Sequence, residues 1–101
     1  MNIFDYNLDR NKDEEFLTEI FKTKNIKIER IVSFGQTTDW YDQDENEFVI
    51  LLEGNAEIEF EEKRIVSLKK GDYIIIPSHD RHRVIKTSSN PDCVWLCFFF
   101  K

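Results

Sequence analysis

The chain is 101 residues long and carries 14 basic and 20 acidic residues, which give a formal net charge of −6. This acidity argues against a nucleic-acid partner, because phosphate backbones are bound by basic faces and no Lys/Arg cluster here is large enough to form one. No apolar run approaches membrane-spanning length and no signal peptide opens the sequence, so we expect a single cytoplasmic domain without a membrane partner.

Residues 13–22 predict the one helix of the chain. Acidic residues occupy its first turn, where they complement the helix dipole, and four apolar residues share one face. Those residues are Phe16, Leu17, Ile20 and Phe21. We expect this short helix to flank a β body, with residues 1–24 as an N-terminal segment and residues 25–101 as a barrel domain.

From residue 25 onward the sequence pattern predicts short strands. In residues 26–34, isoleucine and valine alternate with lysine, glutamate and serine, which is typical of a half-buried strand. Residues 48–52 and 73–76 are wholly apolar or aromatic, which predicts strands buried on both faces. Further strands are expected at residues 56–60, 65–68, 83–87 and 93–100. Turn signals about every eight to twelve residues favour an all-β antiparallel sandwich or barrel.

The strand at residues 48–52 continues backward into a polar loop. Counting by twos along it places Leu51, Val49, Glu47, Gln43 and Tyr41 on one face. Polar side chains at the end of an apolar face either line a pocket or point into solvent where the strand leaves the sheet. Both interpretations stay open at this point.

Two blocks of the sequence resemble the two cupin motifs. The first motif, G-x5-H-x-H-x3-E-x6-G, falls without gaps on Gly35, Tyr41, Gln43, Glu47 and Gly54. The second, G-x5-P-x-G-x2-H-x3-N, falls on Gly71, Pro77, His79, His82 and Lys86. Both histidines of the first motif are therefore replaced, as are the second glycine and the asparagine of the second. The resemblance covers roughly residues 30 to 100 and implies a small antiparallel cupin-type β-barrel, or jelly roll.

The resemblance also implies a divalent metal ion inside the barrel. Transferred position by position, it implies Gln43, Glu47 and His82 as ligands, with Tyr41 and His79 as additional or neighbouring groups. Two oxygen donors and one imidazole form a weak, open set that could hold Fe, Mn, Ni or Zn, although not a closed structural zinc site. A metal-free alternative is that Gln43 and Glu47 hydrogen-bond across the barrel mouth while Tyr41 satisfies His82.

We expect a small-molecule pocket lined by Trp40, Tyr41, Val49, Leu51 and Val84. The aromatic pair at the mouth could stack on a ligand or close the barrel end. Arg81 and Arg83 flank His82 but point the other way in an extended chain, which predicts salt bridges outside the barrel.

The last strand, residues 94–100, is apolar on both faces. One face fills the barrel, and the other must be covered by the predicted helix or by a second subunit, so we expect a homodimer with sheets packed back to back. Cys93 and Cys97 would lie about 13 Å apart along a strand, too far for a disulfide. We interpret them as buried small hydrophobic residues in a reducing compartment.

Three functional hypotheses follow. The first is a small cytoplasmic barrel that binds a divalent metal and a small molecule. The second is a small metal-dependent enzyme of the isomerase, decarboxylase or dioxygenase type. The third is a metal-free structural or ligand-sensing barrel.

Overall fold

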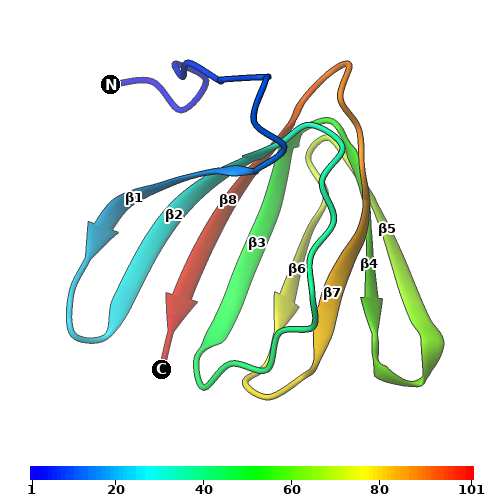
Figure 1. Ribbon diagram of the computed structural model, residues 1–101. Coiled ribbons are helices and arrows are strands. Elements are labelled where there is room, and N and C mark those ends of the chain that lie inside the picture. Colours follow the sequence, from blue (N-terminus) through cyan, green and yellow to red (C-terminus); the bar gives the residue numbers. More distant parts are fainter.

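The chain folds into two antiparallel sheets, and the computed structural model describes all 101 residues. The strands are β1 (Phe16–Lys22), β2 (Ile26–Ser33), β3 (Asn46–Glu53), β4 (Asn55–Phe60), β5 (Arg64–Lys69), β6 (Tyr73–Ile76), β7 (His82–Thr87) and β8 (Cys93–Phe100), with the 3-10 turn η1 (Glu61–Lys63). One sheet has the order β1-β2-β8-β3-β6 and the other the order β5-β4-β7 (Figure 1). The all-β jelly-roll prediction is confirmed. No helix has the length and apolarity that a membrane span requires.

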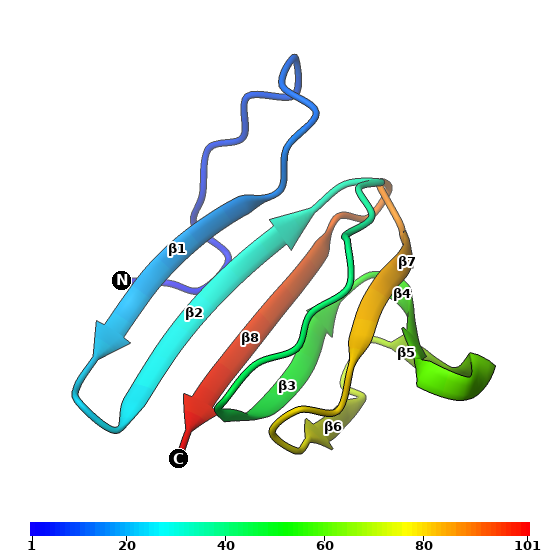
Figure 2. The ribbon, with the colours of Figure 1, turned by 60° about the horizontal axis from the view of Figure 1, so that its bottom comes forward.

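The hydrophobic core lies between the inner faces of the two sheets. Alternate residues of each strand point inward, as the period of two requires. The buried core residues are Val49, Leu51, Ala56, Ile58, Phe60, Leu68, Ile76, Cys93, Trp95 and Cys97. Cys93 and Cys97 are both buried and free, as expected. The segment between β2 and β3 crosses from the larger sheet to β7 (Figure 2), where the Thr38 amide donates to the Val84 carbonyl over 2.9 Å.

The predicted helix at residues 13–22 is wrong. Residues 16–22 form β1, an edge strand that pairs antiparallel with β2 from Phe16↔Val32 to Lys22↔Lys27. A ten-residue helix is marginal in water, whereas phenylalanine, threonine and isoleucine favour strands and β2 offers a row of unpaired backbone groups. The proposed boundary after residue 24 therefore runs between two strands of one sheet.

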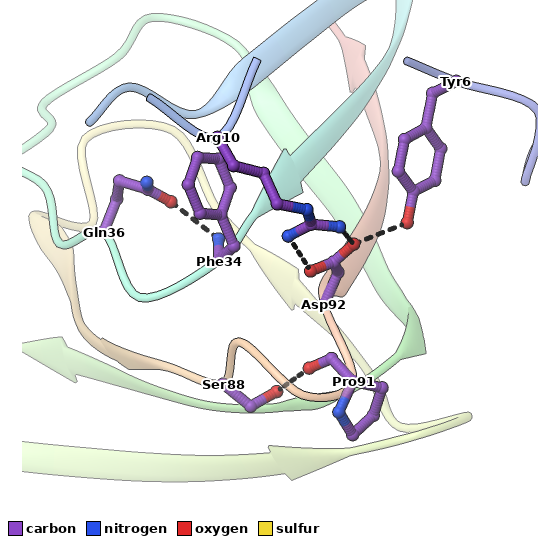
Figure 3. Close-up of polar contacts among 7 residues, drawn as sticks. All are labelled: Tyr6, Arg10, Phe34, Gln36, Ser88, Pro91 and Asp92. Carbon is purple, nitrogen blue, oxygen red and sulfur yellow. Dashed lines mark hydrogen bonds and ion pairs between the residues drawn. The ribbon is translucent and has the colours of Figure 1, made fainter. Parts of the chain in front are cut away.

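Hydrogen bonds with Asp92 and Arg30 hold residues 1–12 against the barrel. Asp92 accepts hydrogen bonds from the Tyr6 hydroxyl (3.0 Å) and from two nitrogens of Arg10 (2.9 and 2.8 Å), as Figure 3 shows. The bidentate bond from Arg10 holds the pKa of Asp92 below its ordinary value of 3.8. Arg30 of β2 adds a second attachment, since one of its nitrogens donates to the carbonyls of Ile3 and Asp5.

We expect Asp92→Asn to release the N-terminal segment without unfolding the barrel. The lowered pKa of Asp92 means that its contribution is present above pH 3.8 and is lost as the pH falls below that value. Hydrogen exchange of the amides in residues 1–12 should therefore rise in the variant at neutral pH, and in the wild type only in acid. Exchange that stays equal in the two proteins would show that Arg30 alone holds the segment.

The outer face of the five-stranded sheet is apolar. Ile28, Phe98, Phe48 and Ile75 form one row across β2, β8, β3 and β6. Residues 73–76 are not buried on both faces as predicted, because Tyr73 and Ile75 on this outer face are 60% and 64% exposed. The reason is that only one face of β6 packs against the core between the two sheets, and no element covers the other face.

Candidate functional site

A cavity of about 320 Å³ lies inside the barrel, between the two sheets. All five strands of the larger sheet line it on one side, β4 and β7 line it on the other, and the crossing segment between β2 and β3 also contributes. Six of the residues expected at the site line it: Tyr41, Gln43, Glu47, Val49, His82 and Val84. Trp40, Leu51 and His79 are not among the lining residues.

Glu47 is the buried carboxylate of the cavity. It lies on the inner face of β3 and is 7% exposed, and the Gln43 side-chain amide donates to its Oε1 over 3.2 Å. Burial raises the pKa of Glu47, and the Gln43 hydrogen bond and the nearby His82 offset this only in part. A carboxylate that is costly to ionise when buried suits a site completed by a cation.

His82 faces Glu47 from the first position of β7. Its Nδ1 lies 2.9 Å from the Asp80 carbonyl, which can only accept, so Nδ1 carries a proton and the neutral ring presents its lone pair at Nε2. Nε2 lies 3.8 Å from Glu47 Oε1, beyond hydrogen-bond distance, and has no hydrogen-bond partner. The rings of Tyr41 and Phe60 flank the imidazole, with centroids 5.6 and 5.8 Å away.

Tyr41 is held beside His82 by its backbone rather than by its hydroxyl. The two residues form an isolated antiparallel bridge, in which the Tyr41 amide donates to the His82 carbonyl over 2.7 Å and the His82 amide donates back over 3.1 Å. The Tyr41 ring reaches the cavity mouth and is partly exposed. The alternative in which Tyr41 satisfies His82 therefore does not describe this geometry.

His79 and Trp40 lie outside the cavity. His79 Nδ1 is 2.6 Å from Asp42 and its Nε2 is 3.3 Å from Asp44, so both ring nitrogens are engaged at the surface. The Asp42 hydrogen bond raises the pKa of His79. Trp40 lies beneath the guanidinium groups of Arg81 and Arg83, 5.1 and 4.6 Å from its ring centroid.

The cavity also holds charged residues that the sequence pattern did not single out. Glu15, Lys27, Glu29 and Glu45 all line it. Lys27 and Glu29 alternate with isoleucine along β2, and such alternation alone favours the charged side facing water. Here the inner face carries the charges and Ile26 is 42% exposed, because the barrel encloses a polar cavity at this end.

The donors at this site fit a weakly held, open metal site. Atoms that share a metal at bond lengths near 2.1 Å lie roughly 3–4 Å apart, a range that includes the 3.8 Å between His82 Nε2 and Glu47 Oε1. The Asp80 carbonyl fixes the imidazole tautomer, as carbonyls commonly do behind metal ligands. No three His, Cys, Asp or Glu side chains gather to hold an ion, so Gln43 and water would have to complete the coordination.

A protein-family model described as the cupin domain matches residues 32–99, more than half of the chain. The chain belongs to the cupin family. This cupin places His79, with φ 61°, where the second motif has glycine, so the motif position requires the left-handed conformation that glycine adopts most easily.

Solved structures place this cupin among close and distant relatives. A crystallised protein from Ralstonia eutropha JMP134, provisionally assigned as a mannose-6-phosphate isomerase, is 32% identical, with 100% of this chain and 96% of that chain covered and a TM-score of 0.90. A cupin superfamily protein from Desulfitobacterium hafniense DCB-2 is 14% identical over 92% of this chain and 83% of that chain, with a TM-score of 0.79, and shares the fold. A search of curated proteins found no match.

Proposed function

We propose that this cupin binds a divalent metal ion and a small molecule in the barrel cavity. The observation that carries the proposal is the pair formed by His82 Nε2 and Glu47, two buried donors that face each other over 3.8 Å without a hydrogen bond between them. Gln43 would supply a third donor through its amide oxygen. A bound divalent ion would polarise an oxygen of the ligand. The two free, buried cysteines favour a reducing compartment, and we propose the cytoplasm.

Elemental analysis of untagged protein tests the metal site. We expect stoichiometric Fe, Mn, Ni or Zn in the wild type and its loss in the Glu47→Ala/His82→Ala double variant, with the fold preserved by circular dichroism. His79→Ala is the matched control, because it removes the other histidine of the chain, which lies at the surface. Less than about a tenth of an equivalent in the folded wild type, before and after incubation with each metal, would leave the metal-free barrel as the better description.

A metal-dependent isomerase is the second candidate. The protein from Ralstonia eutropha JMP134, 32% identical over the whole chain, favours this reaction over the decarboxylase and dioxygenase alternatives. The test is conversion of mannose 6-phosphate by metal-loaded protein, compared with His82→Ala and His79→Ala. Turnover lost only in His82→Ala would support catalysis at the cavity, and no turnover in the wild type would count against it.

We further propose that two copies pair through the outer face of the five-stranded sheet. Stable interfaces bury about 800 Å² on each partner, and the apolar row from Ile28 to Ile75 supplies a self-complementary apolar surface for such pairing. We expect a dimer by analytical ultracentrifugation, and a monomer for Ile75→Glu. Ile65→Glu is the control, since Ile65 is similarly exposed but lies on β5 of the other sheet. A monomeric wild type, or a dimer that survives Ile75→Glu, would contradict the pairing.

A further inference from the structure

The charges around the cavity are strongly one-sided. Four glutamates line it, and the only lysine or arginine among the lining residues is Lys27. The glutamates are Glu15, Glu29, Glu45 and Glu47. A metal ion between Glu47 and His82 would neutralise Glu47, which leaves three glutamates against one lysine around the rest of the cavity.

Strand register places Lys27 and two of these carboxylates, Glu47 and Glu29, near the Phe99 ring. Lys27 of β2 and Glu47 of β3 both lie opposite Phe99 of β8, and Glu29 lies opposite Cys97. Phe99 therefore lies in the row between Lys27 and Glu47, with Glu29 one row further along. Glu29 is only 9% exposed, and its negative charge raises the pKa of both Glu15 and Glu47 after the larger effect of burial on each.

The position of the Lys27 ammonium shows which kind of group the β2 side of the cavity can bind. Its ammonium lies 3.6 Å from Glu29 Oε2 and 4.6 Å from the centroid of the Phe99 ring. A carboxylate beside an aromatic face is a favourable setting for an ammonium group. The Lys27 side chain is 34% exposed and long, so it can swing out of the cavity and leave this position to another cation.

A second feature of the cavity points to a ligand independently of the glutamates. His82 is 5% exposed, yet its Nε2 has no hydrogen-bond partner and faces the same cavity. Nε2 is not sealed from the cavity, because Arg30 Nε is the one fully buried side-chain nitrogen or oxygen without a partner. A group bound in the cavity can therefore reach Nε2, and a small molecule bound beside that group would meet the charged side chains at the β2 end.

We propose that the ligand is a small molecule bearing a protonated amine, bound by Glu29 against the Phe99 ring in the place now taken by the Lys27 ammonium. The proposal rests on the cavity being a ligand site, as proposed above. Glu15 contributes a further carboxylate, and Lys27 competes with the ligand for Glu29. With the metal on Glu47, a phosphorylated sugar would still meet three further carboxylates and one lysine on the cavity wall, so a dianion is disfavoured there.

Three probes that share one sugar ring and differ in charge test the proposal: mannosamine, mannose and mannose 6-phosphate. We expect calorimetric titration of the metal-loaded protein, at a pH where the amine is protonated, to rank mannosamine first and mannose 6-phosphate last. Glu29→Gln should weaken mannosamine binding by about tenfold or more, because it deletes a charge-assisted hydrogen bond. Lys27→Gln should raise that affinity. Glu57→Gln, the same charge change on β4 outside the cavity, should leave it unchanged.

The proposal would be overturned if mannose 6-phosphate bound most tightly and Lys27→Gln lost that affinity, because Lys27 would then be the group that binds the phosphate. Equal binding of the three probes, or binding of none, would also overturn it. Metal content measured on the same samples separates the two proposals. If the protein binds no metal but prefers the amine, only the metal site is contradicted. If it binds metal but shows no preference for the amine, only the proposed ligand class is contradicted.

Discussion

Gly54→Ala is expected to lower the free energy of unfolding by about 3 kcal/mol, combining the cost of a positive φ with that of overpacking. Gly54 lies where the chain leaves β3 of one sheet and enters β4 of the other, with φ +95°. An added Cβ would lie 2.7 Å from the Asp92 carbonyl oxygen and 2.8 Å from Cys93 Sγ. The Asp92 oxygen is a backbone atom just before β8, and Cys93, the first residue of β8, is fully buried, so the clash cannot be relieved by moving a flexible side chain.

Gly71→Ala is the matched control for this prediction. Gly71 has a similar φ of +91°, but nothing lies within 4 Å of an added Cβ. Gly71→Ala should lower the free energy of unfolding by only about 1–2 kcal/mol, which is the penalty of the left-handed conformation itself. The difference between the two variants in urea unfolding measures the close approach at Gly54. Equal losses would mean that the β3–β4 crossing relaxes freely.

Glu47→Gln is expected to stabilise the metal-free protein at neutral pH by about 1–3 kcal/mol, since it removes a buried charge that is only partly paired. Burial holds the pKa of Glu47 above its ordinary value of 4.5. Below pH 4.5 the carboxyl is protonated in both the folded and unfolded states and costs nothing. As the pH rises through the folded-state pKa, ionisation of Glu47 lowers the stability of the wild type. The variant has no carboxyl at this position and does not show this loss.

The same substitution is expected to abolish stabilisation by metal. A metal that binds only the folded protein should add about 2.7 kcal/mol at a hundredfold excess over its dissociation constant, in the wild type but not in Glu47→Gln. Urea unfolding across pH 4 to 8, with a chelator and with added metal, measures both effects. A variant that is less stable than the metal-free wild type at neutral pH would show that Glu47 is a structural group rather than a ligand kept at a cost in stability.

The sequence was sufficient for the all-β class, for the strands from residue 26 onward and for the grouping of several cavity residues, because these depend on local period and exact spacing. The alternation along residues 41–51 correctly grouped Tyr41, Gln43, Glu47 and Val49 on the cavity side of β3 and the crossing segment. The turn glycines and Pro77 carried the cupin motif spacing, and the family match covers the same region. These features are set by neighbours in the chain, where the geometry of a strand leaves little freedom.

Only the tertiary structure decided that residues 16–22 form a strand and which faces of β2 and β6 are covered. The sequence of residues 16–22 fits one face of a helix and also the two faces of a strand, and the open edge of β2 selects the strand. Lys27 and Glu29 carry no sign of burial, yet barrel closure turns them toward the cavity, while Tyr73 and Ile75 are left on an uncovered outer face. By itself the sequence determined the strands from residue 26 onward, their turns and the motif positions of Glu47 and His82. Which charges meet inside the barrel depends on contacts between residues far apart in the chain, and no local pattern specifies these.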